Sequence, residues 1–235
     1  MKGFASGLVG CAGAVSLTLF VLGAVLAYAR VVPGLAGLGL CALGMMIGVV
    51  SGVAGFVMVA RSGMSVSAAF GLLGLPGAAF LIYSVVSARG APAINDISTD
   101  LVYPPPFVHA LKLPANEGRD MRYPESFKEV VKEAYPELRS LGLTDAVDAV
   151  FARAMDLARE EGWEVTSSEI TQKDSVIEGY ATTHVFGFVD DFVIRITKAE
   201  GGGCVVDMRS KSRDGKGDLG ANAARISEFF SKLKP

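Results

Sequence analysis

The sequence predicts two structural parts, an all-α membrane anchor of three transmembrane helices and an α+β soluble domain. In the soluble domain, helices are expected to cover one face of a four-stranded antiparallel meander. Three observations lead to this prediction. Residues 1–89 carry almost no charge, residues 125–235 contain alternating polar and apolar runs, and a proline-rich tether, residues 90–124, separates them.

The spacing of its few charges predicts the anchor. Lys2, Arg30, Arg61 and Arg89 leave uncharged runs of 27, 30 and 27 residues. A helix crosses roughly 30 Å of hydrocarbon with about 20 apolar residues, so each run can span a bilayer. A signal peptide is the alternative for the first run, but the run exceeds the usual apolar region and two further spans follow it.

Small residues recur every four positions in the second and third runs, at Gly44, Gly48 and Gly52 and in the repeat from residue 63 to residue 71. This spacing lets helix backbones approach closely, either between copies of the chain or within one anchor. Packing within one chain is the preferred interpretation, because three spans already need such contacts. Pro76 is expected to kink the third span.

The anchor contains no ionisable residue inside a run, which argues against a transporter or a proton relay. Lys2 and Arg61 lie at one side of the predicted bundle, and Arg30 and Arg89 lie at the other. The positive-inside rule then favours a multi-pass membrane protein with a cytoplasmic N-terminus and its soluble domain on the exported side.

The remaining chain is acidic. All 24 Asp and Glu residues lie from Asp96 onward, together with 18 of the 22 basic residues, which makes the net charge of this part −6. A nucleic-acid partner is not expected, because such binding depends on neutralising phosphates. Cys11, Cys41 and Cys204 form no disulfide or zinc pattern, so neither a metal nor a cofactor is predicted.

The tether contains Pro104-Pro105-Pro106, which favours extended structure. A simple spacer needs no large apolar residues, yet this one has Ile94, Ile97, Val102, Tyr103 and Phe107. We therefore expect the tether to pack along the soluble domain.

Apolar periodicity in the soluble domain predicts helices over residues 127–134, 144–162 and 219–233, and strands over 163–172, 176–186, 192–198 and 204–210. One face of the predicted sheet is apolar and lies under the last helix. The apolar positions are Ile177, Ala181, Val185, Phe192, Ile194, Ile196, Cys204, Val206 and Met208.

The opposite face carries polar residues, among them His184, Arg195, Asp207 and Arg209. Antiparallel sheets often leave one face in water, so a solvated face is the expected state. An anion or metal site is the alternative.

The stretch from residue 207 to residue 226 leaves the last strand, crosses Gly215 and Gly217, and enters the last helix. Arginines, hydroxyls and free helix amides beside these glycines are the ingredients of an anion site. Asp218 is equally suited to cap the helix, with Asn222 and Arg225 tying that face to the backbone, which would make the stretch a structural latch. A calcium loop is the third alternative, although the spacing is not that of an EF-hand.

No known catalytic motif is present, and His109 and His184 are isolated from each other in the sequence. No catalytic residue is assigned.

Three separated blocks are distinctive: Asn95-Asp96-Ile97-Ser98-Thr99-Asp100, Phe186-Gly187-Phe188 before Asp190-Asp191, and residues 207–226. They resemble a bacterial and plastid family, domain of unknown function number fourteen ninety-nine. The resemblance covers nearly all of residues 91–235, and the anchor is similar to the family's membrane-tethered branch. It implies an envelope-associated domain without an assigned activity, in which the tether motif meets the strand-to-helix motif in space.

The leading functional hypothesis is a non-enzymatic, membrane-anchored module that binds an anionic small molecule or a lipid head group. The alternative is an envelope scaffold acting through a protein partner or a homo-oligomer, and a hydrolase is less favoured. The candidate ligand-binding residues are Asn95, Asp96, Asp100, Arg195, Asp207, Arg209, Ser212, Arg213, Asp218, Asn222 and Arg225.

Overall fold

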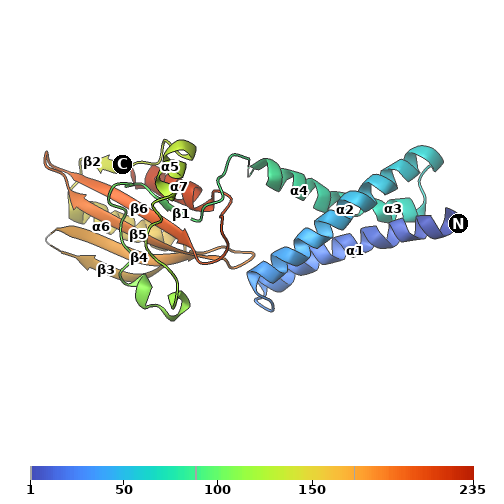
Figure 1. The fold of residues 1–235 in the computed structure, drawn as a ribbon, viewed down its shortest axis with the longest axis horizontal. Helices are drawn as coiled ribbons and strands as arrows, with labels where there is room; N and C mark the ends of the chain where they lie inside the picture. The colour runs from blue at the N-terminus through green and yellow to red at the C-terminus, as the bar shows by residue number, and fades with distance from the viewer. Residues whose placement is uncertain (1, 88, 172) are drawn as a thin grey trace. The chain divides into compact units, whose positions relative to one another are not determined.

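The computed structural model describes residues 2–87, 89–171 and 173–235. The chain forms two compact units (Figure 1). One comprises Met1–Arg89 with Thr183–Gly187, and the other comprises Gly90–Thr182 with Phe188–Pro235.

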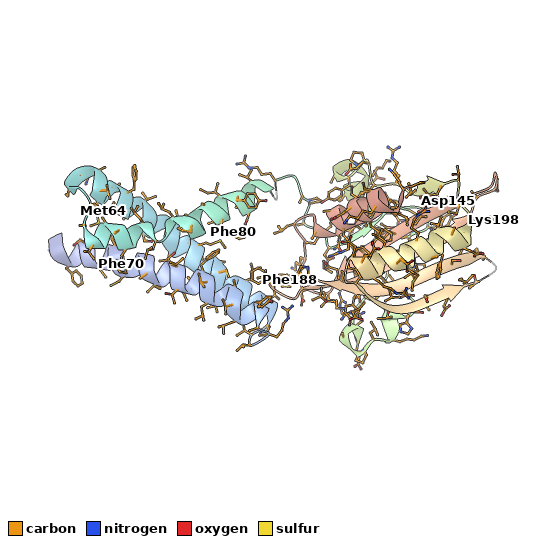
Figure 2. The ribbon with its side chains drawn as sticks, turned by 180° about the vertical axis from the view of Figure 1, so that it is seen from behind. Met64, Phe70, Phe80, Asp145, Phe188 and Lys198 are labelled. Atoms are coloured by element: carbon orange, nitrogen blue, oxygen red, sulfur yellow. The ribbon has the colours of Figure 1, made fainter. Side chains whose placement is uncertain are left out.

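The anchor consists of α1 (Lys2–Tyr28), α2 (Gly34–Ser62), α3 (Val66–Leu72) and α4 (Leu75–Ser87). Three stretches are long and apolar enough to cross a membrane: Phe4–Tyr28, Gly34–Ser62 and Val66–Val86. Their outer surfaces expose large apolar side chains, such as Phe70 and Phe80 (Figure 2). The prediction of three spans is confirmed at the level of helix length and composition.

The third span is divided between α3 and α4 rather than kinked within one helix. The division falls at Leu73 and Gly74, so that Pro76 becomes the second residue of α4. Proline is tolerated in a first helical turn, where its missing N–H group would have no intrahelical partner. The predicted distortion therefore lies two residues before Pro76.

Glycines let the backbones of the anchor approach one another. A Cβ atom placed on Gly44 would lie 2.7 Å from the backbone oxygen of Ser16, and one on Gly48 would lie 2.6 Å from the backbone oxygen of Gly74. Real Cβ atoms do not come this close. The glycine repeat of α2 thus packs against α1 and the third span of the same chain, which favours the intrachain interpretation.

The second unit contains a six-stranded antiparallel sheet that does not close. Its strands are β1 (Asp96–Ser98), β2 (Leu141–Leu143), β3 (Glu164–Ile170), β4 (Asp174–Thr182), β5 (Val189–Lys198) and β6 (Cys204–Ser212). The order is β1-β6-β5-β4-β3, with β2 also paired to β6. The antiparallel α+β arrangement is confirmed, but the predicted count of four strands is wrong. β1 and β2 have three residues each, too few for alternation to be recognised.

Helices cover one face of the sheet: α6 (Val147–Glu160) and α7 (Ala221–Leu233), seen from behind in Figure 2, and α5 (Phe127–Ala134) near β1. The core between them buries Phe192, Ile194 and Met208 fully. Trp163 stacks on Phe229 with 5.3 Å between ring centroids. The predicted apolar face is confirmed except at Val185, which lies beyond the end of β4 and is exposed.

The opposite face is covered by residues 100–124, which we call the strap. The strap crosses β4, β5 and β6 and includes the short helices η1 (Ala110–Lys112) and η2 (Pro114–Asn116) (Figure 1). Its Phe107, Ala110 and Met121 pack on Val193 of β5. The expectation of a solvated face is therefore wrong where the strap lies, because this face is polar but buried.

The anchor packing leads to a paired glycine test. Gly48→Ala should destabilise the anchor, since the new methyl group meets backbone atoms, and overpacking typically costs about 1–3 kcal/mol. Gly39 on the same helix is the control, because a Cβ atom placed there has no neighbouring atom within 4 Å. Unfolding of the full chain by a denaturing detergent, followed by helical circular dichroism, should shift for Gly48→Ala and not for Gly39→Ala. Equal effects would contradict this packing.

Candidate functional site

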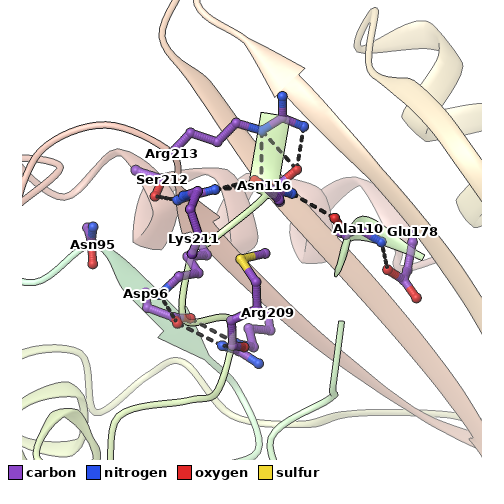
Figure 3. A network of polar contacts seen from close by, with 12 residues as sticks. Asn95, Asp96, Ala110, Asn116, Glu178, Arg209, Lys211, Ser212 and Arg213 are labelled. Carbon is purple, nitrogen blue, oxygen red and sulfur yellow. Dashed lines mark hydrogen bonds and ion pairs between the residues drawn. The ribbon is translucent and has the colours of Figure 1, made fainter. Parts of the chain in front are cut away.

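The centre of the buried polar face is an ion cluster around Asp96. The pairing of β1 with β6 sets Asp96 opposite Lys211 and Ser98 opposite Arg209. Arg209 donates through Nε and Nη2 to the two carboxylate oxygens of Asp96, each at 2.8 Å, and Lys211 Nζ lies 2.9 Å from the same carboxylate (Figure 3). Asp96 is fully buried and Arg209 is 2% exposed, so this pair is shielded from solvent.

Arg209 also fastens both ends of the strap. Its guanidinium donates to the carbonyl oxygens of Pro105 at 3.3 Å and Met121 at 2.9 Å. It lies 4.6 Å from the ring centroid of Phe107 and 5.2 Å from that of Tyr123. Burial, and then the Asp96 charge, raise the pKa of the Tyr123 phenol, which stays neutral beside the cation. One side chain thus connects β1, β6 and the strap.

A second cluster surrounds Asp191 of β5, which is fully buried. Arg213 binds its carboxylate through Nε and Nη2, with the shortest distance 2.6 Å, and stacks 4.9 Å from the ring of Tyr180. From the strap, Asn116 Nδ2 lies 3.1 Å and Arg119 Nη1 lies 3.4 Å from the Asp191 carboxylate. Figure 3 labels Asn116 and Arg213 of this cluster. The middle of the strap is therefore held by charge as well.

Glu178 of β4 holds the start of η1 through backbone N–H groups, and among the described residues it forms no ion pair. Its buried carboxylate accepts from the backbone N–H groups of Val108, His109 and Ala110 at 2.9–3.0 Å, and Figure 3 shows the contact with Ala110. Backbone N–H groups that converge on a carboxylate satisfy a buried charge.

The third cluster joins the beginning of the strap to Asp207 in the first half of β6. Arg195 Nη2 lies 2.9 Å from both Asp207 and Asp100, while Thr99 and Ser140 donate to Asp207 through their hydroxyl groups. Burial lowers the pKa of Arg195, but its hydrogen bonds to Asp207 and Asp100 outweigh burial and raise it. Arg195 therefore stays charged.

The strand-to-helix turn has the geometry of a latch. Asp218 accepts from the backbone N–H groups of Gly220 and Asn222, each at 2.9 Å, so its carboxylate occupies the place where an anion would bind. Asn222 donates to Ser212 at 2.9 Å, and Arg225 pairs with Asp190 at 2.6 Å. The turn also receives a hydrogen bond from Asn95, 2.7 Å from the oxygen of Gly215.

The candidate residues derived from the sequence are thus brought into linked clusters, and the implied meeting of the two motifs is seen in the Asp96–Arg209 pair. Their binding of a ligand stays a prediction. Each of Arg195, Arg209, Arg213 and Arg225 already has a carboxylate partner. Sequence reasoning missed most of the partners, which are Asn116, Arg119, Ser140, Glu178, Asp190, Asp191 and Lys211. Asp190 and Asp191 look like turn residues, and only the β4–β5 register places them inside a strand.

Two cavities flank the segment from Leu138 to Ser140. One, of about 320 Å³, lies between the beginning of the strap and α5, and the other, of about 340 Å³, lies between this segment and α7. Both are lined by Arg139. Among the arginines that the structure describes in Gly90–Pro235, Arg139 alone forms no ion pair, and its Nε donates to the carbonyl oxygen of Pro136 at 2.9 Å.

Metal-binding and nucleophilic groups are dispersed. In residues 2–87, 89–171 and 173–235, no three His, Cys, Asp or Glu side chains gather to hold a metal ion. Cys204 is buried in the core, and burial raises the pKa of its thiol. His109 precedes η1 in the strap, and His184 lies in the loop after β4.

These features define a class of protein: an α+β domain with a charge-latched strap, following an apolar three-span anchor. A family model described as "Protein of unknown function (DUF1499)" matches residues 96–233, and the chain belongs to this family. The matched range runs from Asp96 to the end of α7 and includes the strap. No curated protein and no solved structure shows a significant match.

The central cluster leads to a stability prediction. Asp96→Asn should leave Arg209 and Lys211 as buried charges without a carboxylate, and breaking a buried pair costs about 3–5 kcal/mol. Asp120→Asn is the matched control, because Asp120 and Arg122 form an exposed pair, and no measurable change is expected there. Urea unfolding of the full chain in mild detergent, followed by Trp163 fluorescence, measures both variants. A loss for Asp96→Asn no larger than for the control would contradict a stabilising role.

Proposed function

We propose that the protein is a non-enzymatic, membrane-anchored module that binds an anionic small molecule or a lipid head group at the membrane surface. The observation that carries this proposal is the unpaired guanidinium of Arg139 between two cavities. An arginine without a carboxylate partner keeps its bidentate donors for a phosphate or carboxylate ligand.

The surroundings of Arg139 support an anion. Lys132 lines the first cavity, and its nearest carboxylate is that of Glu129 at 3.7 Å. Lys234, Ser227 and Ser231 line the second cavity, with Ser140 common to both. One carboxylate also lines each cavity: Asp100, which is paired with Arg195, in the first, and Glu137 in the second. The cations outnumber the carboxylate in each cavity, and cations and hydroxyl groups around a concave surface are suited to phosphate oxygens.

The arginines of the polar clusters are less suited to this role. An anion placed near Arg209 or Arg213 has to displace a buried aspartate, and the carboxylate would then lose its partner in a low-dielectric environment. The proposal therefore locates the ligand at Arg139 and assigns the clusters a structural role.

Binding can be tested by thermal shift of the full chain in mild detergent with inorganic phosphate, glycerol 3-phosphate and polyphosphate. A ligand at a hundredfold excess over its dissociation constant stabilises the folded state by about 2.7 kcal/mol. Arg139→Gln should abolish the shift without lowering the melting temperature of the free protein. Arg213→Gln should lower that temperature and keep the shift.

The matched control for Arg139→Gln is Arg159→Gln, since Arg159 is exposed and paired only with Asp156. A flat response of the unmodified chain to every anion would reject the proposal. A thermal shift that is lost in Arg213→Gln but kept in Arg139→Gln would show that the anion binds at the polar clusters and not at Arg139.

A second candidate function is supported by the outer side of the strap. Four large apolar side chains there are more than half exposed: Val102, Tyr103, Val108 and Leu111. Exposed apolar side chains close together in the chain are typical of protein contacts, and this observation favours an envelope scaffold with a protein partner or a second copy of the chain.

Crosslinking in native membranes tests the scaffold. We expect a crosslinked species that is lost in a Tyr103→Ser, Leu111→Ser double variant and kept in Ile170→Ser, which changes an exposed apolar residue on β3 instead. Recovery of monomer alone from the unmodified chain would count against this function.

We further propose the bacterial inner membrane as the location, with the soluble domain on the exported side. The distribution of Lys2, Arg30, Arg61 and Arg89 supports this orientation. Protease added to spheroplasts should then cleave the soluble domain, and full protection would contradict the assignment.

A further inference from the structure

In the turn between β6 and α7, a leucine adopts a left-handed backbone conformation that favours glycine. Leu219 has a φ of +56°, and it is the one non-glycine residue with positive φ that the structure describes in Gly90–Pro235. A branched side chain in this region is disfavoured, and such residues concentrate at functional positions. Glycines occupy three of the neighbouring positions, so glycine would have been an ordinary choice for position 219 as well.

The Leu219 side chain gains little from the fold in return. It is 73% exposed, so no intramolecular packing compensates for the strained backbone. A single exposed leucine is common on protein surfaces. An exposed leucine that also has a positive φ is unusual, and this combination suggests a function for the Leu219 side chain.

The turn is held in one conformation, which keeps Leu219 directed outward. Asp218 accepts from Gly220 and Asn222, and its own N–H group donates to the carbonyl oxygen of Ile94 at 3.2 Å. Asn95 donates to Gly215 at the other side of the turn. The exposed leucine is thus presented by a rigid support.

The covalent chain indicates what this leucine contacts. A Cβ atom on Gly217 would lie 3.2 Å from Cα of Ala93, and one on Gly220 would lie 3.7 Å from the side chain of Ala91. α4, the last apolar helix, ends at Ser87. An extended chain covers at most about 3.6 Å per residue, so the four residues from Ser87 to Ala91 reach about 14 Å. When the third span, formed by α3 and α4, crosses a bilayer, this reach keeps the turn near the bilayer surface.

The chemistry of the turn fits that location. Lys216 is exposed and forms no ion pair with the residues that the structure describes. A lysine beside an apolar residue can hold its ammonium group among lipid phosphates while the leucine enters the boundary with the acyl chains. The net charge of residues 214–219 is −1, from Asp214, Lys216 and Asp218, which makes the apolar contact the larger contribution.

We propose that the turn of residues 214–219 contacts the lipid bilayer, with the Leu219 side chain inserted at the boundary between head groups and acyl chains. This proposal is independent of a ligand at Arg139. It names the bilayer as the occupant because the turn packs on the segment that follows the last apolar helix.

Depth-dependent fluorescence quenching in the full chain tests the contact. Trp163 is the single tryptophan, so Trp163→Phe supplies a silent background that keeps the aromatic stacking on Phe229. In this background, Leu219→Trp is reconstituted into phosphatidylcholine vesicles with and without bromine on the acyl chains. We expect at least twofold stronger quenching by the brominated lipid than for the control variant.

The control is Gly201→Trp in the same background. Gly201 lies in the turn before β6, a Cβ atom there meets nothing within 4 Å, and the nine residues of β6 separate it from the other turn. At about 3.3 Å per residue, this separation is roughly 25–30 Å. Equal quenching of the two tryptophans would overturn the proposal. So would a blue-shifted but unquenched Leu219→Trp emission, which would indicate a protein contact.

A second measurement separates the contact from the fold. Leu219→Gly accepts the positive φ and should leave the melting temperature in detergent unchanged or raise it. With Lys216→Trp as the reporter, Leu219→Gly should reduce the quenching by brominated lipid at least twofold. Unchanged quenching at that reporter would contradict insertion of Leu219.

Discussion

The structure of the soluble domain depends on the desolvation of one aspartate. Asp96 is fully buried, and a carboxylate in that environment is tolerated only when cations and hydrogen bonds replace its water. Arg209 and Lys211 from β6 provide them. Arg209 in turn donates to the carbonyl oxygens of Pro105 and Met121. The ion pair of Asp96 therefore holds β1 in the sheet and also holds the strap across the sheet.

Other buried carboxylates also need hydrogen-bond or ion-pair partners, and they find them along the strap. Glu178 of β4 binds the start of η1, Asp191 of β5 binds the middle of the strap, and Asp207 of β6 lies under its beginning. Apolar contacts can shift with little loss of free energy, whereas a displaced strap would leave several charges unpaired in the interior. The polar face therefore gives the strap one position, and the apolar face under α6 and α7 supplies the hydrophobic stabilisation.

This division has a functional consequence. Cations that neutralise buried aspartates are poor ligand sites, so in the proposed function the anion is bound by a cation that the fold leaves unpaired, Arg139. The basic residues of an acidic domain are thus not equivalent. Their carboxylate partners decide which are structural and which remain for binding.

The sequence by itself determined the three spans, the predicted helices and the apolar face of the sheet, because apolar runs and periodicity are local properties. The family resemblance also implied that the motif containing Asp96 and the motif containing Arg209 and Asp218 belong to one module. Only the tertiary structure decided their partners. Asp96 and Arg209 are 113 residues apart, β1 and β2 are too short to show alternation, and Asp190 and Asp191 resemble turn residues until the strand register is known. Charge pairing over such separations depends on register and chain path, and a linear pattern contains neither.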